Sequence, residues 1–181
     1  MSEEVSEHTP TLPSLTSWSK SRISATFTAP SPAATLAALD ATFARTLRAQ
    51  VNGDAVDFDG FTAMIAGMAE RCAEGGARVD WVWAAEGEDK GDESESGEGE
   101  PGKRAGIVRG EYYIRGTFGV IPGTTELVEL EVRKRVVARI DSLSKDPVID
   151  SRRIVELDAI VNLLPVGPAA PPRVTGSSCQ G

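Results

Sequence analysis

The sequence predicts an α+β fold in which N-terminal helices pack on one face of a curved, mostly antiparallel sheet. Helical spacing of apolar residues dominates up to residue 72, and period-two alternation dominates from residue 79 onward. The clearest alternation runs from 128 to 140, where every second residue is apolar with one exception, Lys134. A long strand with one face on a core gives this pattern, so Lys134 is a charge on the buried face.

The chain of 181 residues suits one domain with a sizeable core. Residues 1–20 are rich in Ser, Thr, Glu and Pro, and we expect a disordered leader there. Residues 165–181 are rich in Pro, Gly and Ser and are expected to form a disordered tail. The single α+β domain then spans 21–164, with an acidic loop inserted at 86–104. Residues 21–29, which are partly β-branched and aromatic, indicate a short edge strand or an extended arm.

Two helices and a hairpin are expected next. Ser31 is a good N-cap with proline after it, and apolar residues follow at helical spacing on one face: Leu36, Leu39, Phe43 and Leu47. Asn52-Gly53 predicts a two-residue hairpin turn, because both central residues of that turn need positive φ. Asp57 or Asp59 then caps a second helix with the stripe Phe58, Phe61, Ile65, Met68 and Cys72, which Gly75-Gly76 ends.

The four predicted strands, near 79–83, 107–118, 127–141 and 152–164, form an antiparallel series with a testable register. If the last connection centres near 146–147, Lys134 lies opposite Ala159 and Arg135 lies opposite Asp158. Pairing across the turn at 121–124 places Tyr112 or Gly110 beside Lys134. A slip by one residue would move Lys134 to the outer face.

Charge and composition restrict the class of partner. The net charge is −8, but residues 86–100 hold eight acids and one lysine, so the rest of the chain sums to about −1. We expect no nucleic-acid partner, because the chain lacks a basic footprint. We expect no membrane partner either, because no apolar run is long enough to span one. The acidic N-terminus is unlike a secretory signal, and Cys72 and Cys179 suit a reducing compartment, so the expected location is cytoplasmic, with nuclear access left open.

This layout is similar to that of the nuclear-transport-factor-2-like superfamily, which includes the SnoaL-like polyketide cyclases, ketosteroid isomerase and scytalone dehydratase. The resemblance covers about residues 31–164 and rests on the order of elements, the segment VNGDAVDFDGF and the long final strands. It implies a cone-shaped half-barrel with a pocket between the helices and the concave sheet, and homodimers packed through the sheet. The family's catalytic residues do not carry over: the sole histidine is His8 in the leader, and no motif fixes an equivalent aspartate.

Lys134 and Tyr112 are the leading candidates for chemistry. A buried lysine can act as a base or as a Schiff-base amine, and a pocket tyrosine can donate a hydrogen bond to a carbonyl or enolate. The competing interpretations are structural: Lys134 as a rim lysine that reaches water over its aliphatic stem, and Tyr112 as a core residue with its hydroxyl at the rim.

Four further residues complete the candidate site. Trp81, Trp83 and Phe61 are expected to contact the ligand, although the two tryptophans also fit a core stripe with Val79. Asp40 is a candidate general base and also fits a solvated helix position.

The sequence has no Cys/His metal cluster, phosphate-binding glycine motif, nucleophile elbow or dinucleotide fingerprint, so we expect neither cofactor nor metal. The leading hypothesis is a small-molecule-binding SnoaL-like protein, with an isomerase, cyclase or dehydratase acting on an apolar carbonyl metabolite as its enzymatic form. The alternative is a non-catalytic homodimerisation or protein-interaction module. It is supported by Val137, Ile154 and Ile160, which the register places on the outer sheet face among charges.

Overall fold

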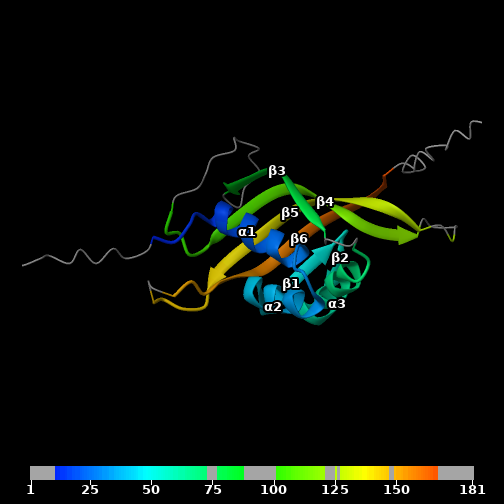
Figure 1. The fold of residues 1–181 in the computed structure, drawn as a ribbon. Coiled ribbons are helices and arrows are strands. Elements are labelled where there is room, and N and C mark those ends of the chain that lie inside the picture. The colour runs from blue at the N-terminus through cyan, green and yellow to red at the C-terminus, as the bar shows by residue number, and fades with distance from the viewer. Residues whose placement is uncertain are drawn as a thin grey trace, which may run out of the picture.

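The computed structural model describes residues 11–72, 77–87, 101–120, 125, 127–146 and 149–166. These residues form three helices and six strands (Figure 1). In chain order the elements are α1 (Leu15–Phe27), α2 (Pro32–Thr42), β1 (Phe43–Val51), β2 (Asp54–Val56), α3 (Phe58–Ala69), β3 (Arg78–Gly87), β4 (Gly106–Val120), β5 (Leu127–Ser142) and β6 (Arg152–Pro165).

The six strands form one sheet in the order β2-β1-β6-β5-β4-β3. All neighbouring pairs are antiparallel except β1 with β6, which is parallel. Side chains from all three helices join the inward-facing residues of the strands in one hydrophobic core. The predicted α+β class, with helices packed on a curved and mostly antiparallel sheet, is confirmed (Figure 1).

Helix α1 corrects the expectation of an extended segment at 21–29. It begins after Ser14, whose hydroxyl accepts a hydrogen bond from the Ser17 amide at 3.2 Å, and so starts inside the segment assigned to the leader. The helix is fixed by burial, because its apolar residues recur at three- to five-residue intervals and enter the core: Leu15, Trp18, Ile23 and Phe27. The acidic segment from 88 to 100, His8 and Cys179 lie outside the described residues.

Helix α2 begins as predicted, with Ser31 as N-cap accepting from the Ala34 amide at 3.2 Å. It ends at Thr42, however, five residues before Leu47, where the predicted apolar stripe ends. Phe43 and Leu47 are buried residues of strand β1, where Leu47, Ala49 and Val51 alternate inward. Leu47 fits both the helical spacing and the alternation of a strand. The segment forms a strand because it pairs with β6.

The predicted hairpin and second helix are confirmed. Asn52 and Gly53 have φ of 53° and 88° between β1 and β2, as the turn requires. The Asn52 side chain also bonds the backbone of Val161 in both directions, accepting at 2.7 Å and donating at 3.2 Å, which ties the hairpin to β6. Asp57 caps α3 by accepting from the Gly60 amide at 2.8 Å. The Gly75-Gly76 stop lies outside the described residues.

The register of the long strand is confirmed on one side and wrong on the other. Tyr112 lies directly opposite Lys134 across β4 and β5. Across β5 and β6, Lys134 lies opposite Val161 and Arg135 opposite Ile160, two residues from the predicted partners Ala159 and Asp158.

A bulge in β6 accounts for one of the two residues by which the predicted register differs from the observed one. Ile140 pairs with Ile154 and Arg139 with Glu156, so one extra residue, Val155, is inserted in β6. The inserted residue exchanges the two faces for the side chains of β6 that precede it. Ile154 is therefore fully buried, whereas the sequence predicts it on the outer face.

Within the described ranges, no helix is both long and apolar enough to cross a membrane.

Candidate functional site

A cavity of about 470 Å³ lies between helices α1 and α3 and the inner face of the sheet. Most of its lining is aliphatic or aromatic, including Phe27, Phe61, Ile65, Val132 and Val136. In the described part of the chain, the polar or charged side chains of the lining are Asn52, Arg71, Tyr112, Thr117 and Lys134, and no carboxylate is among them. The cavity is thus apolar with a small number of hydrogen-bond donors, which is the usual composition of a small-molecule site.

Lys134 lies inside this cavity, with 8% of its surface exposed. Its ammonium nitrogen is 4.4 Å from the centre of the Phe27 ring, a cation–π contact. Among the described residues this ammonium has no hydrogen bond and no carboxylate within ion-pair distance. Burial away from water lowers the pKa of Lys134 from its usual 10.5 to about 8.

Tyr112 is the cross-strand neighbour of Lys134, and both side chains face the same cavity. Directly opposite residues have Cβ atoms about 5 Å apart, so the two side chains leave the sheet side by side on the same face. The Tyr112 ring is held by the rings of Trp81 at 4.5 Å and Phe27 at 6.2 Å. Burial raises the pKa of Tyr112, so at neutral pH its hydroxyl is a protonated hydrogen-bond donor.

The two predicted tryptophans lie on different faces of β3. Trp81 packs behind Tyr112 and donates from its indole nitrogen to the Ser24 hydroxyl at 3.0 Å, so it supports the cavity wall without lining it. Trp83 is 40% exposed and pairs with Glu111 on the outer face. The cause is a bulge that leaves Val82 unpaired between them and reverses the facing of the strand.

Of the remaining predicted site residues, Phe61 lines the cavity and stacks on Phe43 with ring centres 4.9 Å apart. Asp40 does not line it. That carboxylate is exposed on α2 and forms an ion pair with Arg45 at 2.7 Å. The structure therefore brings Tyr112, Lys134 and Phe61 together, with Trp81 behind them.

Sequence reasoning missed several polar or aromatic contributors to the cavity, among them Phe27, Arg71 and Asn52. Phe27 was missed because its segment was expected to be extended. Arg71 is an exposed residue just after α3 that lines the cavity, three residues beyond Met68, which also lines it. Asn52 was assigned only to its turn, although its side chain also reaches β6.

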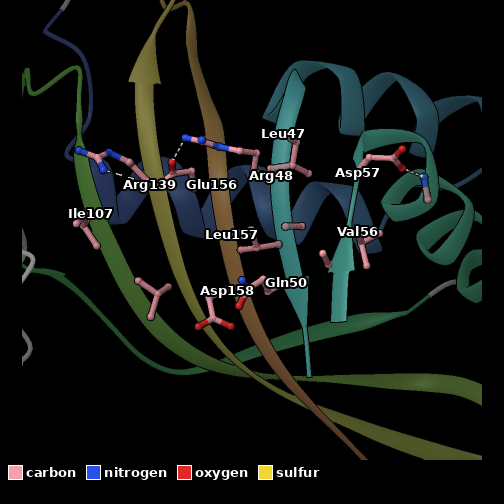
Figure 2. A pocket seen from close by; sticks show the side chains of 14 residues that line it. Leu47, Arg48, Gln50, Val56, Asp57, Ile107, Arg139, Glu156, Leu157 and Asp158 are labelled. Carbon is pink, nitrogen blue, oxygen red and sulfur yellow. Dashed lines mark hydrogen bonds and ion pairs between the residues drawn. The ribbon is translucent and has the colours of Figure 1, made fainter. Parts of the chain in front are cut away.

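A larger and more open groove of about 1,020 Å³ lies on the outer face of the sheet (Figure 2). Three of its charged side chains pair with one another, because Glu156 contacts Arg48 on one side and Arg139 at 3.7 Å on the other (Figure 2). Its wide opening makes it a weaker candidate for small-molecule chemistry than the inner cavity.

The outer face also contains one buried acid, Glu111, between Arg133 at 2.7 Å and Arg135 at 2.8 Å. Burial acts to raise the pKa of Glu111, but the hydrogen bonds from Arg135 and Arg133 outweigh it and hold that pKa below its usual value. Arg135 thus has Glu111 as its partner, where we expected Asp158. This cluster is a structural ion-pair network on the side of the sheet away from the cavity.

In the part of the chain that the structure describes, no group of three or more His, Cys, Asp or Glu side chains is arranged to hold a metal ion.

Comparison with known proteins gives a likeness in structure at low sequence identity. No protein-family model matches the chain, and no curated protein matches it. Among solved structures, a loop-truncation variant of IdmH is similar, with 14% sequence identity, coverage of 80% of this chain and 92% of that chain, and a TM-score of 0.46. At this level of similarity, function has to be inferred from the residues of the cavity itself.

Proposed function

We propose that this protein binds a small, largely apolar molecule with a carbonyl group, as a cofactor-independent SnoaL-like member of the nuclear-transport-factor-2-like superfamily. The observation that carries the proposal is the cross-strand pair Tyr112 and Lys134, whose donor groups face an otherwise apolar cavity. In its enzymatic form the protein is an isomerase, cyclase or dehydratase.

The size and lining of the cavity support a ligand of about two fused rings. A volume of about 470 Å³ lies within the range of roughly 300–1,000 Å³ typical of small-molecule sites. Phe27, Phe61 and the aliphatic side chains of β5 offer apolar surface on every side of the pair. Burial of that surface supplies the affinity, and the polar pair supplies the orientation.

The charges of the cavity favour a carbonyl oxygen at Tyr112 and Lys134. Both side chains can donate hydrogen bonds, and no carboxylate among the described residues of the lining competes for them. The same donors stabilise the negative charge that develops on oxygen when a proton is removed beside a carbonyl. In an enzymatic reaction Tyr112 polarises the carbonyl, and Lys134 moves the proton, since Asp40 lies outside the cavity.

The test compares two naphthalenes that differ in the carbonyl, 2-acetonaphthone and 2-ethylnaphthalene, by thermal shift. A ligand that binds only the folded state raises apparent stability by mass action, by about 2.7 kcal/mol at 100 times its Kd. We expect both compounds to stabilise the protein. The ketone should bind about fivefold more tightly, because one hydrogen bond contributes about 1 kcal/mol.

Tyr112→Phe should remove the advantage of the ketone and leave the hydrocarbon unaffected. Tyr113→Phe is the matched control, because that neighbouring ring lies between Arg115 and Arg133 away from the cavity. No stabilisation by either compound would contradict the proposal. An equal ketone preference in both variants would contradict the role of Tyr112.

Homodimerisation through the outer sheet face is a second proposed property, independent of catalysis. Trp83, Val137 and Ile160 are each at least 40% exposed on this face, beside the Glu111–Arg135 ion pair. Alternating charges and apolar side chains suit a two-fold contact, in which each patch meets its own copy. Light scattering should give twice the monomer mass, and Ile160→Glu should restore the monomer mass. A monomer in the wild type at about 100 μM would end this proposal.

A further inference from the structure

We infer that the amine of Lys134 forms a covalent imine with the carbonyl carbon of the ligand in this cavity. The inference rests on the proposed function, because it assigns a reaction to the same site.

The surroundings of Lys134 provide little stabilisation for its ammonium form. Its neighbours are the Phe27 ring, the Tyr112 side chain across the sheet on one side and Val161 on the other. Among the residues that the structure describes, the titratable or charged groups that face the cavity besides Lys134 are Tyr112 and Arg71, and neither supplies a negative charge at neutral pH. An ammonium has three N–H donors to satisfy, whereas an iminium has one. A site in which water reaches the Lys134 nitrogen poorly therefore favours conversion of the ammonium to the iminium.

The same burial makes the amine available as a nucleophile. With a pKa of about 8 against 10.5 for an ordinary lysine, the neutral fraction at pH 7 is about 300-fold larger than that of an exposed lysine. The cavity also brings the carbonyl to the amine, because Tyr112 lines the same cavity directly opposite Lys134 and carries a hydroxyl that can donate to the carbonyl oxygen.

The reaction balances without an added oxidant or reductant. The lone pair of the neutral Lys134 nitrogen forms a bond to the carbonyl carbon, and the C=O π pair moves to oxygen. A proton passes from nitrogen to that oxygen and gives a carbinolamine. A second proton then lets the oxygen leave as water while the nitrogen lone pair forms the C=N bond. In sum, one ammonium and one carbonyl give one iminium and one water.

Reductive trapping tests the inference directly. The full chain is incubated at pH 7 with 2-naphthaldehyde and sodium cyanoborohydride, which reduces an iminium to a stable secondary amine. Peptide mapping by mass spectrometry then locates the naphthylmethyl group. We expect Lys134 to be labelled at least about tenfold faster than the exposed Lys145, because burial enlarges the neutral fraction of Lys134 and the cavity holds the aldehyde beside it. Lys134→Met should remove that label alone, and excess 2-ethylnaphthalene should suppress labelling of Lys134 and leave Lys145 unaffected.

A parallel measurement separates failure of this inference from failure of the proposed function. 2-Naphthylmethanol has the same ring system and cannot form an imine, so its thermal shift reports occupancy of the cavity alone. Stabilisation by the alcohol with Lys134 labelled no faster than Lys145 would overturn the imine and leave the binding function standing. Absence of both stabilisation and selective labelling would overturn both.

Discussion

Replacing Lys134 with methionine should make the protein more stable at neutral pH. Methionine keeps much of the unbranched side chain and removes a charge that is 8% exposed and lacks a carboxylate partner among the described residues. A fall in pKa from 10.5 to about 8 corresponds to about 3 kcal/mol of destabilisation by the buried ammonium. Partial loss of the Phe27 cation–π contact reduces the expected gain to about 2 kcal/mol.

The pH dependence gives this prediction a distinctive signature. Below pH 8 the lysine is protonated in both the folded and the unfolded state, and its destabilising effect is complete. Between about pH 8 and 10.5 the unfolded chain binds more protons than the folded one, so wild-type stability gains a rising contribution with pH. The advantage of Lys134→Met should therefore be largest at pH 7 and shrink toward pH 10.

Urea unfolding of wild type, Lys134→Met and Lys145→Met at pH 7 and pH 10 measures this effect. Lys145 is exposed, so its variant should follow the wild type at both values. Equal or lower stability of Lys134→Met at pH 7, with no change between the two pH values, would mean that the ammonium is solvated at the rim. The reasoning about a buried amine would then be refuted.

Four substitutions test the surrounding framework, each by urea unfolding. Glu111→Gln should lower the free energy of unfolding by about 2 kcal/mol at pH 7, because it leaves two half-exposed arginines without their shared acid. This difference from the wild type should shrink as the pH falls below about 4.5, because the wild-type carboxyl then becomes protonated. Gly110→Ala should lower the free energy of unfolding by about 2 kcal/mol, because a Cβ there comes within 2.8 Å of the Trp81 ring. Gly67→Ala is the matched comparison: its Cβ meets open space on α3, so it should raise the free energy of unfolding by up to about 1 kcal/mol. Asp57→Ala should cost about 1 kcal/mol through loss of the α3 cap.

The pairing of Tyr112 with Lys134 was predictable, because the alternation of apolar residues fixes which side chains of a strand face the core. Once Lys134 was placed on the core face of its strand, a short turn at 121–124 left two candidates for its neighbour, and the structure selects Tyr112 over Gly110. The hairpin at Asn52 and the cap at Asp57 were predictable for a similar reason, since each depends on a side chain or φ value that few residues provide.

The bulges were not predictable from the pattern. Val82 and Val155 are each the extra residue in a strand, and a valine at either position fits an unbroken alternation equally well. One bulge turned Trp83 away from the cavity and the other buried Ile154, so both errors of facing have the same physical origin.

Helix α1 was missed because its own composition disfavours a helix. Six of its thirteen residues are Ser or Thr, and these lower helix propensity. The helix is stabilised by tertiary contacts that the local sequence does not reveal, since Leu15, Trp18, Ile23 and Phe27 are all buried against the core.

Methyl NMR gives the most direct test of the claim that the inner cavity is the ligand site. Val136 and Val137 are consecutive residues of β5, and the first lines the cavity while the second is exposed on the outer face. Titration with 2-acetonaphthone should shift the methyl resonances of Val136 and Ile65 through ring currents and leave those of Val137 and Ile160 in place. Saturable shifts at Val137 and Ile160 with none at Val136 and Ile65 would contradict the account, and so would the absence of any shift.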